Sequence, residues 1–382
     1  MVIQLIIEVK NMNSKRIAIV GAGIGGIALA ILAARKGYQV NIFERDSEIS
    51  SIGAGVTLWP NAMFVLQQMG LDKQIQALGG MPLFMRQCDR HGTVQSEFDI
   101  AKVNTLSGFS SISILRRDLM SVLGRTLADL GANIHFNSAI TVSEIAQLKQ
   151  DFDLVVGADG RMNSVVRQFL YAEKITPQYQ GFINIIAISD LKPGTLDNVI
   201  HDFRGRGERF GIVPVKADLC YWAAGWSANI DKARPLSAWY EEMHQRFLTW
   251  PDAVQQMLKS YDKNSLKRIF VHDIDRLPYW HQGNVLIMGD AAHAPLPTSG
   301  QGACQALEDA WHLVRVLEKY DDLEHALTAF YQQRIDKTSA SQLVGRQVAQ
   351  KIFTTAADTN ETPALGICAQ QLVTLWMQGL SN

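Results

Sequence analysis

The sequence has few cysteines, little net charge and no long apolar run, and each shortage excludes a class of protein. Four of its 382 residues are cysteines, widely spaced and without a paired motif, which argues against disulfides or a zinc site and fits a reducing cytoplasm. The formal net charge of −1 gives no electrostatic basis for binding nucleic acid. No apolar run approaches the roughly 20 residues of a membrane span. We therefore expect a cytoplasmic protein without a metal, nucleic-acid or membrane partner.

What the chain does have is enough apolar sequence for a large core. Hydrophobic residues make up 47% of it and charged residues 19%, a composition that favours two globular domains over one. The apolar patch within residues 1–10 is interrupted by Glu8 and Lys10, so it is too short and too charged for a secretory signal. We expect residues 1–13 to form a loose extension before the first strand.

A glycine-rich turn near the start of the chain predicts a dinucleotide site. Apolar residues 17–20 lead into the sequence GAGIGG at residues 21–26, and small apolar residues continue to position 34. This order indicates a strand, a tight turn and a helix, in which glycines let the backbone approach a pyrophosphate. The helix N-terminus also offers unpaired amides and a partial positive charge to phosphates. Outside this context, the glycines would indicate only an ordinary turn.

An acidic residue follows the next expected strand, at residues 40–43. Glu44 holds the strand-end position, where a carboxylate can accept hydrogen bonds from an adenosine ribose. Arg45 comes directly after it and would suit a 2′-phosphate instead. We favour the ribose because the carboxylate, rather than the guanidinium, occupies the strand end.

Two later stretches repeat the pattern of a strand followed by glycine and aspartate. Residues 153–156 form an expected strand that ends in GADG, with Asp159 at the edge of the sheet where doubly wound folds bind ligands. Residues 284–288 form another, followed by Asp290 and by the sequence GQG at residues 300–302. A helix with its apolar residues at helical spacing starts at Gly302. Its electropositive end could stabilise a negatively charged reduced cofactor ring.

Together, residues 21–26, 157–160 and 289–302 resemble the flavin-dependent aromatic hydroxylases with the para-hydroxybenzoate hydroxylase fold. The order and spacing of these stretches are preserved over about residues 15–345. The resemblance implies an α/β fold with a Rossmann-like FAD-binding domain, an interleaved and mainly antiparallel β substrate domain, and a C-terminal helix. The alternating short runs in residues 176–227 also favour an antiparallel sheet, with a helical stretch at residues 235–261 packed on it.

The expected division of the chain is as follows. The FAD-binding domain comprises residues 14–82, 115–175 and 279–345, the substrate domain comprises a hairpin at 83–114 and residues 176–278, and residues 346–382 form a C-terminal helical segment.

Matched position by position, the resemblance implies a set of FAD contacts. The glycines of residues 21–26 would face the pyrophosphate, Glu44 the ribose and Asp290 the ribityl chain, while residues 300–303 would lie beside the isoalloxazine ring. Arg116 resembles an arginine that reaches FAD, although an arginine at a helix start is more often a solvated charge. The complete set is Gly21, Gly23, Gly25, Gly26, Glu44, Arg45, Thr57, Arg116, Asp159, Asp290, Gly300, Gln301, Gly302 and Ala303.

The resemblance also implies the reaction. NADH or NADPH would reduce the flavin and leave, dioxygen would add to give a C4a-hydroperoxide, and its distal oxygen would pass to an electron-rich aromatic substrate. The absence of a second glycine fingerprint fits a nicotinamide cofactor that binds only transiently. Asp159 resembles an acid associated with both FAD and the nicotinamide cofactor, but three residues rather than the family's usual two separate Gly160 from Ser164. We therefore expect the local turn to differ from that of the family.

Among members of this family, the chain is most similar to the bacterial FAD-dependent urate hydroxylases. It shares with them the sequences WPN at residues 59–61, GFIN at 181–184 and HDI at 272–274. In those enzymes the residues matching Asn184, Arg209 and Tyr221 contact the purine. The resemblance thus implies that Arg209 stabilises an anionic substrate and that Tyr221 hydrogen-bonds or stacks, which makes both candidate catalytic residues.

The urate enzymes have an aspartate directly after the motif proline, and this chain has Thr298. A neutral hydroxyl cannot take a proton or fix an arginine as a carboxylate would, so Thr298 is a candidate substrate contact of a different kind. Salicylate-like and hydroxypyridine-like aromatics therefore stay open beside urate. Simpler interpretations also stay open: Asn184 satisfying a strand, Tyr221 in a core and Arg209 in a solvated loop.

Two other function classes compete with a monooxygenase. A flavin-dependent halogenase is disfavoured because its Trp-x-Trp-x-Ile-Pro signature is missing; Trp222 and Trp226 have the wrong spacing. A flavoprotein that senses redox state or binds a partner would keep the FAD motifs without transferring oxygen. The apolar helix expected around residues 372–380 could cover the nucleotide domain or form a homodimer contact.

Overall fold

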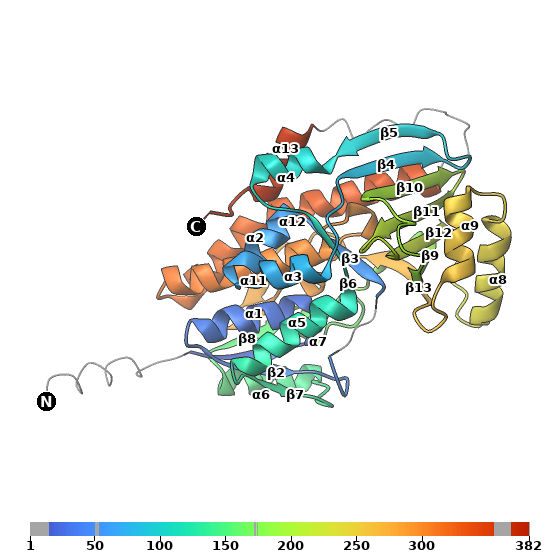
Figure 1. The fold of residues 1–382 in the computed structure, drawn as a ribbon. Coiled ribbons are helices and arrows are strands. Elements are labelled where there is room, and N and C mark those ends of the chain that lie inside the picture. Colours follow the sequence, from blue (N-terminus) through green and yellow to red (C-terminus); the bar gives the residue numbers. More distant parts are fainter. Residues whose placement is uncertain (1–14, 50–52, 172, 174, 355–367, 382) are drawn as a thin grey trace, which may run out of the picture.

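The computed structural model describes residues 15–49, 53–171, 173, 175–354 and 368–381. The loose extension expected at residues 1–13 lies outside this part of the chain. The described chain forms two large sheets, one beside the other, with helices packed on both (Figure 1). Within the described residues, no helix is long and apolar enough to cross a membrane.

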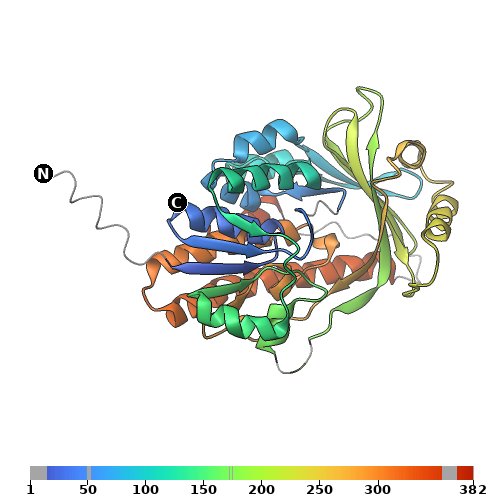
Figure 2. The ribbon, with the colours of Figure 1, turned by 90° about the horizontal axis from the view of Figure 1, so that it is seen from below.

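The first sheet has six strands, and all neighbouring pairs are parallel except the pair of β14 and β15 at one edge. Its strands are β1 (Arg16–Val20), β2 (Gln39–Phe43), β7 (Asn133–His135), β8 (Leu154–Gly157), β14 (His281–Gln282) and β15 (Val285–Ile287), in the order β14-β15-β8-β1-β2-β7. Helices lie on both of its faces (Figure 2). Strands β1 and β8 are therefore buried on both sides and consist almost entirely of apolar residues.

The helices of the chain fall into those around the first sheet, those behind the second sheet and a C-terminal group. They are α1 (Ile24–Arg35), α2 (Pro60–Gln68), α3 (Asp72–Leu78), α4 (Ile100–Ser107), α5 (Arg116–Asp129), α6 (Val142–Asp151), α7 (Val165–Leu170), α8 (Leu236–Arg246), α9 (Asp252–Ser260), α10 (Asp290–His293), the 3₁₀ helix η2 (Pro297–Ser299), α11 (Gly302–Lys319), α12 (Leu323–Phe353) and α13 (Ala369–Met377). The single helical stretch expected at residues 235–261 is two helices, because Pro251 precedes α9 and interrupts the run.

Topology gathers the three motif stretches at one place. The strand β1 leads into residues 21–26, β8 leads into Asp159, and β15 leads into Asp290. Because β15, β8 and β1 are parallel neighbours, their carboxyl ends lie at the same edge of the sheet. Segments far apart in the sequence thus meet where doubly wound sheets bind their ligands.

The second sheet has seven strands and is antiparallel except where β10 meets β4. Its strands are β4 (Phe84–Asp89), β5 (Val94–Asp99), β9 (Gln178–Asp190), β10 (Val199–Gly205), β11 (Glu208–Pro214), β12 (Leu219–Ser227) and β13 (Lys267–Asp273), in the order β13-β9-β12-β11-β10-β4-β5. A separate pair, β3 (Gly55–Leu58) with β6 (Ile112–Leu115), joins the chain segments on either side of the β4–β5 hairpin. This topology confirms the predicted α/β fold class.

The two faces of the second sheet have different characters, because side chains alternate along each strand. One face carries large apolar residues, including Phe210, Trp222 and Trp226, and packs against α8 and α9 in a core of its own. The opposite face carries Asn184, Arg209 and the residues paired with them. Within the described chain, α8 and α9 cover the first face, and the second face is turned toward the rest of the molecule.

The helix α12 connects the two halves of the molecule. It is 31 residues long and packs along α11, and its C-terminal residues Ile352 and Phe353 reach a small core beside β9 and β13. The ring of Phe353 stacks on Phe182 at 4.0 Å between centroids. The last helix, α13, lies beside α4 and α2 (Figure 1).

Candidate cofactor and substrate site

The β1–α1 turn has a separate reason for each of its glycines. Gly21 has φ +104°, and a Cβ there would lie 2.5 Å from the carbonyl oxygen of Ala158. A Cβ at Gly26 would overlap the carbonyl oxygen of Gly21, and one at Gly25 would lie 3.3 Å from Ala306 on α11. At Gly23, by contrast, no described atom lies within 4 Å of the Cβ position. Three glycines therefore serve chain packing, and Gly23 leaves open space beside the turn.

The amides at the start of α1 are suited to an anion. The helix begins at Ile24, and within the described chain no side chain caps its N-terminus and no acid lies in its first turn. Unpaired amides and the helix dipole make such an end electropositive. The open space at Gly23 lies directly before these amides, so the turn fits a pyrophosphate.

Glu44 lies against the same turn. It is 8% exposed, and its Oε2 accepts a hydrogen bond from the amide of Ala22 at 2.7 Å while its Oε1 accepts one from Asp46 at 3.0 Å. A carboxylate oxygen can accept a second bond, so Glu44 could still receive a ribose hydroxyl. The side chain of Arg45 is 69% exposed and pairs only loosely with Asp46, at 3.7 Å. The two neighbours thus occupy different environments.

Asp159 caps the helix α7. Its carboxylate accepts hydrogen bonds from Ser164 Oγ and the Val165 amide, both at 2.6 Å. Burial raises the pKa of Asp159, against these hydrogen bonds, which lower it. Between Gly160 and Ser164, the carbonyl oxygen of Arg161 accepts a hydrogen bond from the guanidinium of Arg167 at 2.6 Å. This bond fixes the start of the three-residue turn.

Arg167 also links two of the motif stretches, a role that sequence reasoning missed. It is 1% exposed, and besides Arg161 it donates to the carbonyl oxygen of Ala291 in α10 at 2.8 Å. The carboxyl-end loops of β8 and β15 are therefore tied by one buried guanidinium. An arginine two residues after a helix start gives no sequence signal for this contact.

Arg116 and Asp290 provide opposite charges near the centre of the site. Arg116 is half-buried, and its Nε is buried without a hydrogen-bond partner among the described residues. Burial lowers the pKa of Arg116, and the nearby Asp290 carboxylate raises it. A Cβ at Gly53, which has φ +119°, would lie 2.8 Å from Arg116 Cδ, so the glycine makes room for this side chain. A buried donor without a partner fits a site built for a bound anionic group.

The loop before α11 is held from two directions. Gly300 has φ +64°, and its carbonyl oxygen accepts a hydrogen bond from Trp59 Nε1 at 3.0 Å. Gln301 is 4% exposed, and its Oε1 accepts a hydrogen bond from Asn61 Nδ2 at 2.9 Å. Trp59 and Asn61 belong to the shared sequence WPN. As at α1, no described side chain caps α11 and no acid lies in its first turn, so its amides present positive charge.

Asn184, Arg209 and Tyr221 lie on the same face of the second sheet. Asn184 is opposite Gly225, Gly225 is opposite Arg209, and Tyr221 is opposite Val213. Between them lie Gly211, Ala223 and Gly225, which are paired or adjacent across β11 and β12. Three small residues thus form a floor, called here the small-residue floor, with larger polar side chains around it.

Two glycines of the small-residue floor lie directly under polar side chains. A Cβ at Gly225 would be 2.5 Å from Asn184 Oδ1 and 3.3 Å from Phe353 Cζ. A Cβ at Gly211 would be 3.8 Å from an Arg209 terminal nitrogen. The amide, the guanidinium and the Phe353 ring therefore approach the floor closely.

Tyr221 connects this face to the strand β3. Its hydroxyl lies 2.9 Å from Thr57 Oγ1, and a Cβ at Gly55 would overlap its ring. Burial raises the pKa of Tyr221, so the phenol stays protonated at neutral pH. Cys304, near the start of α11, lies 3.7 Å from the carbonyl oxygen of Thr57 through its sulfur. Thr57 therefore stands between α11 and the second sheet.

The charge on Arg209 is partly balanced. Asp202 is 2% exposed and accepts hydrogen bonds from Arg209 Nε at 2.5 Å and from Arg204 at 2.7 Å. Burial raises the pKa of Asp202, but Arg209 and Arg204 outweigh it, so the net shift is downward and the carboxylate stays ionised. Two guanidinium groups around one carboxylate give this cluster a formal surplus of one positive charge.

Thr298 has a different surrounding from the three residues around the floor. Its hydroxyl donates to the carbonyl oxygen of Gly345 on α12 at 2.6 Å. A Cβ at Gly345 would lie 3.2 Å from Leu296 Cβ, so α12 runs close to the η2 loop. The hydroxyl that replaces the carboxylate of the urate enzymes thus anchors the loop to α12.

A buried charge cluster under the α11 loop was also missed by sequence reasoning. Asp309 accepts hydrogen bonds from the Gly289 amide at 2.8 Å and from Arg334 at 2.7 Å, and pairs with His293 at 2.5 Å. Burial raises the pKa of Asp309, but His293 and Arg334 hold it well below its ordinary value. Acids at positions 308 and 309, inside an otherwise apolar helix face, were the available signal. Their partners on α12 were not visible in the sequence.

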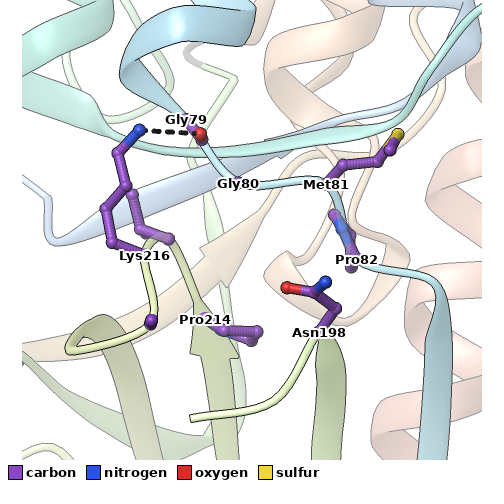
Figure 3. Close-up of a pocket in the computed structure, with 9 residues that line it drawn as sticks. Gly79, Gly80, Met81, Pro82, Asn198, Pro214 and Lys216 are labelled. Atoms are coloured by element: carbon purple, nitrogen blue, oxygen red, sulfur yellow. Dashed lines mark hydrogen bonds between the residues drawn. The ribbon is translucent and has the colours of Figure 1, made fainter. Parts of the chain in front are cut away.

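A small cavity of about 200 Å³ lies apart from this site, where the connection from α3 to β4 passes the β11–β12 turn (Figure 3). Lys216 donates to the carbonyl oxygens of Ala77 at 2.8 Å and Gly79 at 3.1 Å, near the end of α3. A lysine at a helix C-terminus stabilises the unpaired carbonyls there. The contact of Lys216 joins the β11–β12 turn of the second sheet to the end of α3.

No group of His, Cys, Asp or Glu side chains in the described chain could hold a metal ion.

Comparison with known proteins agrees with this geometry. A family model described as "FAD binding domain" matches residues 15–321. Aurachin C monooxygenase/isomerase of Stigmatella aurantiaca is 30% identical over 334 residues, which cover 85% of this chain and 86% of the relative. The FAD-dependent urate hydroxylase of Klebsiella pneumoniae is 28% identical, with 84% and 85% covered. The 6-hydroxynicotinate 3-monooxygenase of Pseudomonas fluorescens is 29% identical, with 92% and 94% covered.

A solved structure has the same fold. Klebsiella pneumoniae HpxO, complexed with FAD and uric acid, superimposes with a TM-score of 0.79 at 24% identity, covering 90% of each chain. At this identity the likeness supports the architecture, including the placement of a parallel sheet beside an antiparallel one.

Proposed function

The chain belongs to the FAD binding domain family of flavoprotein monooxygenases, and we propose that it hydroxylates a small anionic aromatic or heteroaromatic substrate with NADH or NADPH and dioxygen. The family membership confirms the predicted enzyme class and FAD as the cofactor. The reductant, the use of dioxygen, the substrate and the residue roles are our proposal. The cytoplasmic location and the homodimer stay predictions.

The observation that carries the proposal is the small-residue floor with Asn184 and Arg209 directly above it. A flat ring can lie against glycine and alanine, and a guanidinium at its edge can pair with a deprotonated hydroxyl or carboxylate. The surplus positive charge beside Asp202 favours an anion over a neutral ring. An anionic ring is also richer in electrons and so reacts more readily with an electrophilic oxygen. The division into domains that we propose assigns this floor to the substrate domain.

The chain would hold FAD with the residues that converge at the edge of the first sheet. Gly23 and the α1 amides would face the pyrophosphate, Glu44 the ribose, and Arg116 with Asp290 the middle of the cofactor. The amides at the start of α11 would offset negative charge on a reduced ring. Bound FAD supplies the oxygen chemistry: with NAD(P)H and a proton it splits dioxygen, so that one oxygen atom enters the substrate as a hydroxyl and the other leaves as water.

Tyr221 and Thr57 would close the space between cofactor and substrate. The tyrosine is protonated, so it can donate one hydrogen bond but cannot serve as a base at neutral pH. It would therefore orient the substrate or the threonine hydroxyl and exclude water from the ring. Arg209 would fix the substrate anion. We assign the proton acceptor to no residue.

Thr298 bears on which anion is bound. Its hydroxyl is neutral, so it offers no charge that could position a purine as a carboxylate would. The hydroxyl is also engaged in a hydrogen bond to the carbonyl oxygen of Gly345. We therefore propose a substrate class that includes urate, hydroxypyridine carboxylates and hydroxybenzoates. The names of the relatives, urate hydroxylase and 6-hydroxynicotinate monooxygenase, support this range.

The test combines reductant consumption with oxygen labelling. Purified FAD-loaded protein is supplied with NADH or NADPH and with urate, 6-hydroxynicotinate or salicylate under ¹⁸O₂, and the products are analysed by mass spectrometry. We expect at least one anion to accelerate NAD(P)H oxidation and to gain a single ¹⁸O atom. Uptake of FAD with peroxide as the sole oxygen product for every compound would instead indicate a flavoprotein that does not transfer oxygen.

A pair of variants isolates the proposed role of Arg209. Arg209→Gln and Arg204→Gln each remove one of the two guanidinium groups that pair with Asp202, so they perturb the buried carboxylate similarly. We expect Arg209→Gln to raise KM for the accepted anion by at least tenfold and Arg204→Gln to raise it much less. Equal effects would show that both arginines act only by stabilising Asp202.

A further inference from the structure

The helix α13 reaches the loop before α11 through two tryptophans. The ring of Trp376 lies 4.9 Å from the ring of Trp59, tilted by 37°. Trp59 in turn donates its indole N–H to the carbonyl oxygen of Gly300 at 3.0 Å. Gly300, which has a left-handed backbone conformation, is thus hydrogen-bonded to the Trp59 side chain, and Trp376 of α13 packs against that side chain. The contact crosses from the C-terminal end of the chain to residues proposed to face the flavin.

A second connection runs from the end of α13 through buried charges. Lys337 on α12 donates to the carbonyl oxygens of Trp376 at 2.6 Å and Gln378 at 3.2 Å. These carbonyls lie at the C-terminal end of α13, where backbone acceptors lack helical partners and the dipole favours a cation. The same ammonium pairs with Glu308 at 2.7 Å. Lys337 is therefore satisfied partly by α13 itself.

Glu308 continues this connection to the loop. It is fully buried, and its other oxygen accepts a hydrogen bond from Asn61 Nδ2 at 2.7 Å. The same amide nitrogen of Asn61 donates to Gln301 Oε1. A continuous series of polar contacts thus joins the end of α13 to Gln301, parallel to the tryptophan contact on Gly300. Since these groups are buried, a partner that is lost leaves an uncompensated charge or dipole.

The contact of α13 with its neighbours leaves unfilled space. A groove of about 330 Å³ lies where α13 meets α2 and α4, and its lining includes Phe64, Phe109, Val373 and, at the C-terminal end of α13, Met377 and Leu380. Unfilled space of this kind lowers the packing energy of a helix on its neighbours. The docking of α13 therefore depends strongly on Trp376 and Lys337, the two residues that also lead to the loop.

We propose that α13 is a positioning element for the cofactor: its docking, through Trp376 and Lys337, fixes residues 300–302 in the conformation that receives the flavin ring. Trp376 acts through Trp59 and Lys337 acts through Glu308 and Asn61, so neither needs to touch FAD. The proposal rests on the proposed role of residues 300–303 at the cofactor and does not depend on the identity of the substrate. Because binding linkage is reciprocal, FAD in turn stabilises the docked α13.

The test measures FAD affinity of the apoprotein by fluorescence titration. We expect Trp376→Ala to raise the Kd for FAD by roughly fivefold to tenfold, the size of effect that loss of an aromatic pair produces. Trp376→Phe keeps a ring on Trp59 and should stay near the native value. Thr374→Ala, on the exposed side of α13, is the matched control and should not change the Kd. An unchanged Kd in Trp376→Ala, with only a lower melting temperature, would overturn the proposal and leave α13 a purely structural helix.

Two further measurements make the outcome decisive. In the native protein, FAD should slow amide hydrogen exchange in residues 369–377, and unchanged exchange there contradicts the proposal even if Trp376→Ala fails to fold. Gly300→Ala strains the loop directly, because position 300 has φ +64°. If Gly300→Ala leaves FAD affinity unchanged, the proposed cofactor role of the loop is wrong. If it weakens FAD while Trp376→Ala does not, only the role of α13 is wrong.

Discussion

An alanine at position 225 would place a methyl group on the small-residue floor, between strands that carry the proposed substrate contacts. Its Cβ would lie 2.5 Å from Asn184 Oδ1, 3.1 Å from the carbonyl oxygen of Ile183 and 3.3 Å from Phe353 Cζ. The first of these is the end of a side chain and can move, whereas the second is backbone. We therefore expect the amide of Asn184 to be displaced from the floor while the strands stay in register.

The cost of Gly225→Ala is expected to divide between stability and substrate binding. Overpacking by one methyl group costs about 1–3 kcal/mol in a rigid core, and the movable amide places this site near the lower limit. For the substrate, a lost hydrogen bond contributes about 1 kcal/mol and the methyl group removes contact area worth about as much again. A total of about 2 kcal/mol corresponds to a decrease in kcat/KM of roughly thirtyfold.

The assay for Gly225→Ala compares kcat/KM for the accepted anion, the Kd for FAD and the melting temperature. Gly211→Ala is the matched comparison, because its methyl group meets only Arg209, at the ordinary distance of 3.8 Å. We expect a clearly smaller loss of kcat/KM in Gly211→Ala and an unchanged Kd for FAD in both. A normal kcat/KM in Gly225→Ala, combined with a lower melting temperature, would refute the assignment of this face to the substrate.

Three further predictions concern Gly23, Arg116 and the buried His312. Gly23→Ala should fold with native stability, since no described atom lies within 4 Å of the new methyl group, yet should weaken FAD binding by at least tenfold in a fluorescence titration because the methyl group enters the proposed pyrophosphate space. Arg116→Met should raise the melting temperature of the apoprotein, because it removes a buried and unpartnered guanidinium nitrogen, and should raise the Kd for FAD. Burial lowers the pKa of His312 to about 4. This histidine should therefore lower the free energy of unfolding by about 3 kcal/mol between pH 6.5 and pH 4. Urea titrations should show a smaller loss over this pH range in His312→Gln.

The sign of the His312 effect follows from the proton balance. In the unfolded chain the imidazole takes up a proton near its ordinary pKa of about 6.5, whereas in the fold it stays neutral until about pH 4. Its contribution to stability is therefore complete above pH 6.5 and is lost as the pH falls to the folded value. An identical pH dependence in His312→Gln would contradict this account. Tight FAD binding in Gly23→Ala would contradict the proposed pyrophosphate space at Gly23. A lower melting temperature of the Arg116→Met apoprotein would contradict the proposed cost of the unpartnered nitrogen.

The glycine-rich turn at residues 21–26 and the acid after β2 were predictable from the sequence because they depend on local rules. Glycines at 21 and 26 are required by backbone approach within a single turn, and an acid at the end of a strand is a position that can be counted. The parallel order of β15, β8 and β1 then brings the three stretches together without further specification. The enzyme class followed from the same residues, through the resemblance that they carry.

The partners of buried charges were not predictable in this way. Glu308 and Asp309 lie on α11, and nothing in the sequence connects them to Arg334 or Lys337 on α12. Thr298 stays a predicted substrate contact, but the bond that its hydroxyl makes was not predictable. Its bond to Gly345 depends on the path of α12, which is set by long-range packing. The break between α8 and α9, by contrast, follows from a local rule, because Pro251 cannot continue a helix.

This contrast has a consequence for how substrate range can change in the chain. FAD would be held mainly by backbone amides of a turn in which Gly21 and Gly26 meet backbone atoms and Gly23 leaves space for the cofactor, so we expect few substitutions there to be tolerated. The substrate would be held by side chains on β9, β11 and β12 above the small-residue floor, where a Cβ added at Gly225 would crowd Asn184 and one added at Gly211 would meet Arg209 at an ordinary distance. We expect single substitutions of side chains on these strands to leave the strand pairing and the first sheet intact. We therefore expect the choice of aromatic anion to be alterable at positions 184, 211 and 225 without loss of FAD, and a library at these three positions should separate the two properties.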